Sequence, residues 1–360
     1  MANSEKVKIL IDGFWIGKYS GYGRFIFEMC NALSQVNSEF DISVLVPRSA
    51  HGPLPKFGPG VSIIAAPKMP GPIWEQIILP AYALFGGFRV LHSPFNTRPI
   101  IVGPQRTVTT VHDLTFLIEG AERDWKAKII HAYMKISFFL GSVRSKVLIS
   151  VSDTTGNHLK DIGFSSTTVY NTVDAFLETK KEAGCVNSRP YFVHRGSYAQ
   201  GHRNTKNIID AFLSREYLSK NFELRIFGIP QGAEYWGLAP DSGVTFLSRV
   251  TDAELATIYS EAVAVVAVSI LEGFCLPIIE GFGFGVPVIS SDIDPMKEIA
   301  GDGAILVSPD RPDEIADAMV RVGENAGLRE QLIAAGSRRI KDFSYEAMAD
   351  GLLSVYRSVA

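Results

Sequence analysis

The feature that most constrains the fold is an alternation of short apolar runs with amphipathic stretches, which recurs along the whole chain of 360 residues. Apolar runs bounded by turn residues predict buried strands, and strands that alternate with helices predict a parallel sheet covered on both faces. The predicted strands are 7–11, 41–47, 61–65, 90–92, 107–112 and 146–151 in the first half, and 191–195, 223–228, 244–247, 263–268, 286–290 and 303–307 in the second.

A chain of this length predicts about two domains. The polar segment 179–190, which contains a glycine and ends on a proline, is the predicted linker. We therefore expect an α/β protein with two Rossmann-like, doubly wound domains, 1–178 and 190–342, facing each other across a cleft with ligands at the carboxyl ends of strands. A last helix, within 343–360, has Ser344 as its N-cap. The sequence leaves open whether this helix returns to the N-terminal domain.

Composition excludes several classes of protein. Hydrophobic residues make up 46% and charged residues 20% of the chain, as in ordinary globular proteins. The net charge of −3 argues against nucleic acid as a partner. The three cysteines lie far apart, which favours reduced thiols and a cytoplasmic protein. No uncharged apolar stretch reaches the roughly 18 residues that would span a bilayer.

Charge is distributed unevenly along the chain. Residues 1–180 contain 18 Lys and Arg against 14 Asp and Glu, a balance of +4, whereas the remaining residues have a balance of −7. Segment 123–146 interleaves cations with large apolar residues. A basic amphipathic helix would suit peripheral contact with a membrane at its inner face. The alternative is a helix packed on the sheet.

The strongest chemical signal is segment 272–280, Glu-Gly-Phe-Cys-Leu-Pro-Ile-Ile-Glu, which follows the very apolar run 262–268. Glu272 is therefore expected just past the carboxyl end of a strand. Pro277 fits the first turn of a helix, where its missing N–H costs nothing.

The start of that predicted helix offers hydrogen-bond donors. The backbone N–H groups of Phe274, Cys275 and Leu276 suit an anion or sugar hydroxyls. Glu280, about one turn into the helix, can accept two hydrogen bonds from a vicinal diol such as a ribose. The alternative is a solvated helix face with two carboxylates, and the apolar, glycine-rich flanks argue against it.

This segment resembles the E-x7-E signature (E-G-F-G-L-P-x-x-E) of the family-four retaining glycosyltransferases, which have the two-domain GT-B fold. The resemblance extends over nearly the whole chain. The supporting segments are Ser-Gly-Tyr-Gly-Arg at 20–24, Val-His-Asp at 111–113, Val-Ser at 151–152, Tyr-Asn-Thr-Val-Asp at 170–174 and Phe-Ser-Tyr-Glu at 343–346. The residues of the N-terminal segments resemble those of bacterial polysaccharide mannosyltransferases.

The resemblance implies roles for several residues. It implies that Glu272 contacts the transferred sugar, that Glu280 binds the nucleotide ribose, and that His112 hydrogen-bonds the donor sugar. A satisfied core histidine is the alternative for His112. Gly21 and Gly23, in the first loop, would let the backbone approach a phosphate. Asp113 is either a base or an N-cap, with the N-cap favoured, and the role of Arg24 stays open.

The phosphate clamp departs from the family pattern. The family shows a strand, a glycine and then Arg-Lys-Asn, and this chain has Gly196 followed by a longer segment to Lys206. Arg203 and Lys206 are the predicted cations for the leaving diphosphate, and Arg195 competes with Arg203. Cys275 replaces the second glycine of E-G-F-G. A cysteine would be strained if the backbone there needs a positive φ. We expect instead that the position tolerates this replacement of glycine.

We therefore interpret the sequence as a retaining glycosyltransferase that transfers a hexose from GDP-mannose or a UDP-hexose to an acceptor hydroxyl, on a glycan or a lipid-linked glycan. No cofactor and no metal are expected. Asp292-Ile-Asp294 has metal-ligand spacing, but its position before a helix favours capping. The alternatives are a dinucleotide-dependent oxidoreductase, which would need a third glycine after Gly23, and a non-catalytic nucleotide-sugar-binding protein.

Overall fold

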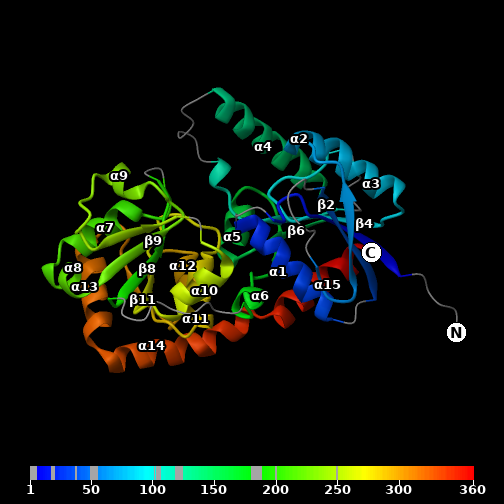
Figure 1. Ribbon diagram of the computed structural model, residues 1–360. Helices are drawn as coiled ribbons and strands as arrows, with labels where there is room; N and C mark the ends of the chain where they lie inside the picture. The colour runs from blue at the N-terminus through cyan, green and yellow to red at the C-terminus, as the bar shows by residue number, and fades with distance from the viewer. Residues whose placement is uncertain are drawn as a thin grey trace. The chain divides into compact units, whose positions relative to one another are not determined.

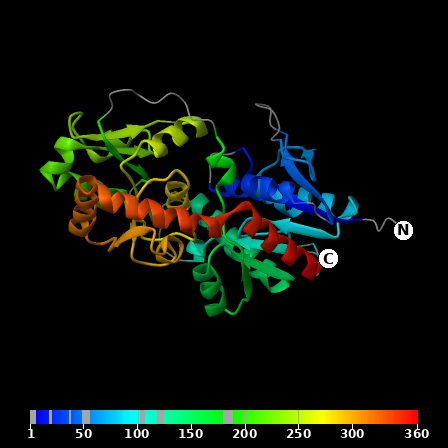
Figure 2. The same ribbon diagram turned by 90° about the horizontal axis from the view of Figure 1, so that it is seen from below.

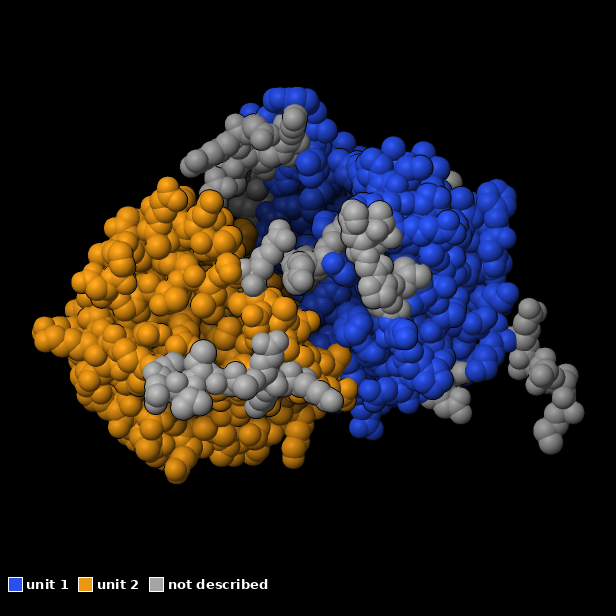
Figure 3. Space-filling model, viewed as in Figure 1, with its two compact units in different colours: residues 1–172, 344–360 blue, residues 173–343 orange. Residues whose placement is uncertain are grey.

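A computed structural model describes residues 6–17, 21–36, 39–48, 56–100, 102, 107–117, 125–179, 189–198, 201–248 and 250–360. The chain forms two compact units, coloured separately in Figure 3. Unit 1 comprises Met1–Thr172 and Ser344–Ala360, and unit 2 comprises Val173–Phe343. Most of the predicted linker, residues 180–188, lies outside the described residues.

Unit 1 is built on a parallel sheet of seven strands in the order β3-β2-β1-β4-β5-β6-β7 (Figure 1). The six strands predicted for this half are confirmed. Strand β7 was not predicted, because it has only three residues and all three are polar. The strands are β1 (Val7–Asp12), β2 (Phe40–Pro47), β3 (Val61–Ala66), β4 (Val90–Ser93), β5 (Thr107–Val111), β6 (Val147–Ser150) and β7 (Ser166–Thr168).

The helices of unit 1 connect these strands and include the end of the chain. The first helix begins at Gly21, three residues before the predicted start, so Gly21 and Gly23 lie in its first turn and not in a loop. The helical elements are α1 (Gly21–Gln35), α2 (Gly71–Ile73), η1 (Trp74–Ile78), α3 (Leu79–Phe85), η3 (Thr115–Leu117), α4 (Trp125–Arg144), α5 (Asp153–Asp161) and α15 (Tyr345–Val359).

Helix α15 packs on α1 within unit 1 (Figure 2). Ser344 is its N-cap, as predicted, and accepts a hydrogen bond from Ala347 N. The Tyr356 hydroxyl lies 2.8 Å from Nδ1 of His92, whose Nε2 lies 2.8 Å from Thr110 Oγ1. His92 is fully buried, and burial lowers its pKa to about 3. It therefore joins the last helix to the sheet.

Unit 2 repeats the architecture with six parallel strands in the order β10-β9-β8-β11-β12-β13. All six strands predicted for this half are confirmed to within two residues at each end. They are β8 (Tyr191–Arg195), β9 (Glu223–Phe227), β10 (Val244–Leu247), β11 (Ala264–Ala267), β12 (Val288–Ser291) and β13 (Ala304–Val307).

The helices of unit 2 cover its sheet. The apolar pattern of 207–218 predicts a single helix, but the segment forms parts of two helices, because Arg215 adopts an extended conformation (φ −116°, ψ 106°) after the first. The helical elements are α6 (Asp174–Leu177), α7 (Thr205–Leu213), α8 (Glu216–Asn221), α9 (Gly232–Trp236), α10 (Asp252–Ser260), α11 (Leu276–Gly283), α12 (Met296–Ala300), α13 (Pro312–Glu324), α14 (Ala326–Arg339) and η4 (Ile340–Phe343).

The sheet of unit 2 is covered on both faces, as a doubly wound fold requires. Val266 and Ile289 face a core that includes residues of α7 and α13. Their neighbours Val265 and Val288 face the other way, where α11 packs so closely that a Cβ on Gly281 would lie 2.7 Å from Val288 Cγ2. Alternation along a strand produces this two-sided burial. Helix α11 follows β11 in the chain, so the N-terminus of α11 lies at the carboxyl edge of the sheet.

Candidate active site

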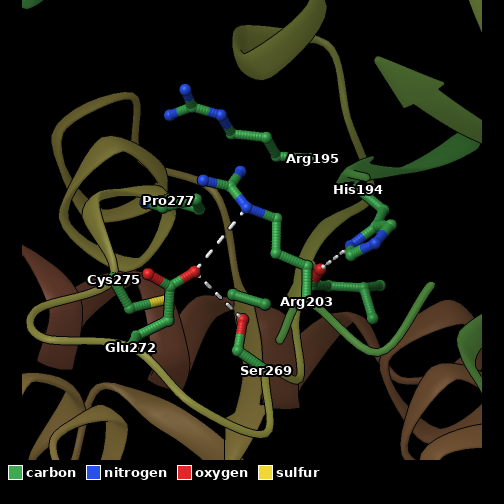
Figure 4. Close-up of a pocket in the computed structure, with 9 residues that line it drawn as sticks. His194, Arg195, Arg203, Ser269, Glu272, Cys275 and Pro277 are labelled. Atoms are coloured by element: carbon green, nitrogen blue, oxygen red, sulfur yellow. Dashed lines mark hydrogen bonds and ion pairs between the residues drawn. The ribbon is translucent and has the colours of Figure 1, made fainter. Parts of the chain in front are cut away.

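A pocket opens in unit 2 at the carboxyl edge of its sheet (Figure 4). Three segments build it: the end of β8 with the loop that follows, the end of β11 with its loop, and the start of α11. Ligands of doubly wound sheets bind at this edge. The lining residues are His194, Arg195, Arg203, Val266, Ala267, Ser269, Glu272, Cys275 and Pro277.

Backbone hydrogen bonds join the loop before α7 to the loop before α11. The amides of Ile270 and Leu271 donate to the carbonyl oxygen of His202, at 2.5 and 3.4 Å. This contact brings Arg203 to Glu272, with 3.7 Å between Arg203 Nε and Glu272 Oε1 (Figure 4). The longer segment that separates Gly196 from Lys206 therefore folds back to the pocket.

Glu272 lies at the mouth of the pocket. Its side chain is about one-fifth exposed, and Ser269 Oγ lies 3.5 Å from its Oε1. Arg195 lines the same pocket, and Figure 4 shows its guanidinium group extending beside that of Arg203. The site therefore combines one carboxylate with two guanidinium groups. Such a site can orient a sugar hydroxyl and counter the charge of a phosphate.

His194 forms the buried wall behind the pocket. Its Nδ1 lies 2.8 Å from the carbonyl oxygen of Val266, which can only accept, so Nδ1 carries the proton. Its Nε2 then accepts from the Thr205 hydroxyl at 3.0 Å, and Thr205 Oγ1 accepts from Ser197 N at 3.0 Å. Burial lowers the pKa of His194 to about 4, so the ring is neutral at pH 7. This network ties β8, β11 and α7 together beneath the pocket.

Cys275 occupies the left-handed region of the backbone, with φ 76° and ψ 67°, as the N-cap of α11. The expectation that this position tolerates any residue was therefore wrong, because glycine adopts this conformation without a Cβ clash. The side chain is buried, and burial raises the pKa of its thiol well above the usual value, so the thiol is neutral. Pro277 is the second residue of α11, which confirms its predicted place in the first turn.

Glu280 lies inside unit 2 and not at an open surface. It is 1% exposed, and its Oε2 accepts a hydrogen bond of 2.6 Å from the Tyr259 hydroxyl of α10. The described structure therefore holds this carboxylate inside the unit, and its role in binding a ribose stays a prediction. Tyr259 carried no sequence signal, because it occupies an ordinary apolar position of a helix.

Lys206 does not line the pocket that contains Arg203. It is the second residue of α7, and its ammonium group pairs with Asp210 one turn further along the helix. Gly196 lies at the end of β8, where a Cβ would lie 2.4 Å from Ile229 Cδ1, so packing within the unit already requires a glycine. Phe274 and Leu276 flank Cys275 and are buried at the start of α11.

The candidate residues of unit 1 lie at the carboxyl edge of its own sheet. His112 follows β5 and is nearly buried against the rings of Tyr22 and Phe25. Its Nε2 donates to Pro94 O at 3.1 Å, which leaves Nδ1 as the acceptor of a neutral ring. Burial lowers its pKa to about 4.

Asp113 and Arg24 are the residues whose roles the sequence left open. The carboxylate of Asp113 accepts hydrogen bonds from the amide and the hydroxyl of Thr115, at 2.9 and 2.6 Å. These two bonds form an Asx turn ahead of η3, and the choice between a base and an N-cap stays a prediction. Arg24 lies in the first turn of α1 and is half-buried.

Neither Asp292 nor Asp294 is the N-cap of α12, contrary to the expectation for one of them, because that N-cap is Pro295 without a side-chain hydrogen bond. Asp292 instead pairs with Lys297 at 2.9 Å. Within the part of the chain that the structure describes, no group of three or more His, Cys, Asp and Glu could hold a metal ion. Over the same residues, no helix is both long and apolar enough to cross a membrane.

Comparison with known families finds a match for the part of the chain that contains this pocket. A family model described as glycosyl transferases group 1 matches residues 179–339, a range that includes every residue lining the pocket. This region of the chain is similar to that family. The architecture agrees, because two parallel-sheet α/β units form the GT-B fold of such glycosyltransferases.

Two curated proteins to which this chain is similar are named as mannosyltransferases. The O-antigen chain mannosyltransferase B of Escherichia coli is 31% identical over 114 residues, 32% of this chain and 30% of that protein. The phosphatidyl-myo-inositol mannosyltransferase of Mycobacterium leprae is 26% identical over 270 residues, 72% of this chain and 67% of that protein. The match thus spans 30% of the length of the first relative and 67% of the length of the second.

Solved structures agree with the fold. Sucrose-phosphate synthase from Thermosynechococcus elongatus has a TM-score of 0.75 at 16% identity, over 98% of both chains. Anabaena HepE in complex with UDP-glucose has a TM-score of 0.68 at 16% identity, over 98% of this chain and 99% of that one. At these identities the likeness shows the fold alone.

Proposed function

We propose that this protein is a retaining hexosyltransferase that moves mannose or glucose from a nucleotide diphosphate sugar to an acceptor hydroxyl. The observation that supports this most strongly is the approach of Arg203 to Glu272, beside Arg195 and the start of α11, within the region of the family match. A carboxylate beside two guanidinium groups suits a sugar joined to a diphosphate. The names of the relatives favour mannose and a glycan or lipid-linked glycan acceptor.

Each residue has a distinct role in the proposed reaction. Glu272 accepts hydrogen bonds from hydroxyls of the transferred sugar. Arg203 and Lys206, with the backbone amides of Phe274, Cys275 and Leu276, counter the charge that grows on the leaving diphosphate. The leaving phosphate helps to deprotonate the acceptor on the same face of the sugar, which retains the anomeric configuration. No metal is needed for this charge balance.

The remaining predicted residues contact other parts of the donor. Glu280 accepts from the ribose hydroxyls, as the resemblance implies. The Nδ1 acceptor of His112 meets a hydroxyl of the donor sugar. Gly21, Gly23 and Gly196 keep the backbone near the phosphates open. Acceptor binding through unit 1 completes the proposal.

A thermal-shift panel of GDP, UDP, GDP-mannose, UDP-glucose and NAD tests the proposal first. A nucleotide present at 100 times its Kd should stabilise the protein by about 2.7 kcal/mol. A shift with NAD alone would indicate the oxidoreductase. A shift with a nucleotide sugar, without turnover in the presence of any acceptor, would indicate a binding protein. The anomeric configuration of the product, measured by NMR, tests retention.

Glu280→Gln tests the ribose assignment more sharply than alanine, because an amide oxygen still accepts from Tyr259 and the buried site stays filled. Loss of the charged acceptor should weaken nucleotide binding by about 1–3 kcal/mol in calorimetric titration. Tyr259→Phe is the control, since it removes the internal hydrogen bond that Glu280→Gln keeps and leaves the carboxylate. Equal affinity of Glu280→Gln and the unmodified protein would remove Glu280 from the donor site.

A further inference from the structure

Exposed apolar side chains gather on two helical segments of unit 1. Among the described residues, twelve of the eighteen large apolar side chains that are exposed belong to segments 69–85 and 125–143. Phe85 is 89% exposed, Val143 75% and Trp125 67%. Apolar patches of this kind on a folded protein mark interaction sites. We call the exposed side chains of these two segments the apolar surface.

Helix α4 carries most of this surface. Trp125, Ile129, Ile136 and Val143 are spaced by four, seven and seven residues and therefore lie along one face of the helix. Another face is internal, because the buried ring of Phe138 packs against other aromatic rings of the same unit. A helix that is apolar on its inner and outer faces suits an apolar environment on both sides.

The second segment, α2–η1–α3, contributes Ile77 and Phe85 and is attached to α4 by polar contacts. The Glu75 carboxylate accepts hydrogen bonds of 2.8 Å from the hydroxyls of Tyr133 and Ser137, both on α4. Gln76 Nε2 donates to the same tyrosine hydroxyl at 3.2 Å. Figure 1 shows α4 beside α2 and α3, in agreement with these contacts.

The charge on this surface has one sign. Segment 125–146 contains five Lys and Arg and no Asp or Glu, and the second segment is flanked by Lys68 and Arg89. The single acid, Glu75, is turned inward to the hydroxyls of α4. The whole chain has a net charge of −3, so the positive charge is local.

We propose that the apolar surface docks the chain on an anionic lipid bilayer. Its apolar side chains would enter the boundary between headgroups and acyl chains, and its cations would meet lipid phosphates. Two copies of this cationic surface would repel each other, so the charge favours lipid over a second copy of the chain. The proposal rests on the proposed function for the lipid-linked acceptor alone, since docking itself requires no turnover.

Vesicle flotation of the full chain, without donor or acceptor, tests the proposal. Vesicles of phosphatidylcholine mixed with phosphatidylglycerol should bind at least about tenfold more protein than phosphatidylcholine alone. In 1 M salt the difference should shrink, because the Debye length falls to about 3 Å. A chain that floats with neither kind of vesicle would overturn the proposal.

Substitutions separate the apolar from the ionic contribution. Ile136→Asp with Val143→Asp should lower binding at least about tenfold, and so should Lys128→Glu with Arg144→Glu, since both remove interactions with lipid. Ile162→Asp and Lys160→Glu, at exposed positions of α5 in the same unit, are matched controls that should bind normally. Circular dichroism verifies that each variant is folded.

The outcomes distinguish this proposal from the proposed function. Full binding by the variants on α4 would overturn the docking surface. So would a dimer in sedimentation that Ile136→Asp with Val143→Asp disrupts while vesicles bind nothing. Turnover of a soluble acceptor without vesicle binding contradicts the docking proposal alone. Vesicle binding without any turnover contradicts the proposed glycosyl transfer alone.

Discussion

Cys275 shows how one residue type can conflict with the backbone that holds it. The left-handed conformation at the N-cap of α11 costs a non-glycine residue on the order of 1 kcal/mol, and the chain nevertheless has a cysteine there. The buried Sγ contributes packing that a glycine would lack. The geometry of the helix start, which holds Leu276 and Pro277 beside Glu272, is therefore maintained against local strain.

Cys275→Gly and Cys275→Ala separate these two contributions. Both variants lose the sulfur, but only glycine also relieves the strain, and glycine is preferred to alanine at an N-cap. We expect Cys275→Gly to be more stable than Cys275→Ala by about 1 kcal/mol in urea unfolding. An alanine variant as stable as the glycine variant would contradict the positive φ.

The two candidate cations differ in their surroundings, and their substitutions should be compared directly. Arg203→Ala and Lys206→Ala should each lower kcat at least about tenfold, about 1.4 kcal/mol of barrier, because each removes charge that meets the leaving diphosphate. Lys220→Ala is the matched control, since Lys220 forms a similar exposed pair with Glu216 one turn away. Normal turnover in either clamp variant would exclude that residue from the clamp.

At the scale of secondary-structure elements, His194 joins two strands to α7 through hydrogen bonds that require a neutral ring. Its pKa is about 4 in the folded protein against 6.5 in the unfolded chain. Between these values the unfolded state binds more protons, so the contribution to stability is complete above pH 6.5 and is lost as the pH falls toward 4.

Lowering the pH from 7.5 to 5 should therefore decrease the free energy of unfolding by on the order of 2 kcal/mol through this histidine. His194→Gln, which cannot be protonated, should lose less free energy of unfolding over the same pH interval. His158→Gln, at an exposed position of α5, should keep the pH dependence of the unmodified protein. Urea titrations at both pH values measure these slopes. The same slope in His194→Gln would contradict a neutral, buried ring.

At the scale of the whole molecule, the charges needed for the reaction are already present in side chains and in a helix start. Arg203 and Arg195 line the pocket, and α11 begins beside them. Activity should therefore persist in excess chelator, because cationic side chains and amides meet the diphosphate. Turnover measured with EDTA, then with added Mg²⁺ or Mn²⁺, is the test. If EDTA abolished turnover and the added metal restored it, the proposal that cationic side chains and amides balance the charge of the diphosphate would be wrong.

The sequence by itself determined the parts of this protein that depend on local pattern. All twelve predicted strands are present, because buried parallel strands are near-continuous apolar runs that cannot be exposed to water. Ser344 and Pro277 mark helix starts for reasons of local chemistry, and both were predicted. The short polar strand β7 and the break between α7 and α8 lack such a pattern and were missed.

Only the tertiary structure decided which side chains meet. Arg203 lies next to Glu272 because backbone hydrogen bonds join residues almost 70 positions apart. No local spacing in the sequence encodes such bonds. The burial of Glu280 against Tyr259 and the packing of α15 on α1 depend in the same way on contacts between distant elements. Helical periodicity predicts that a face is apolar, whereas the neighbour that covers it is chosen by the packing of the whole unit.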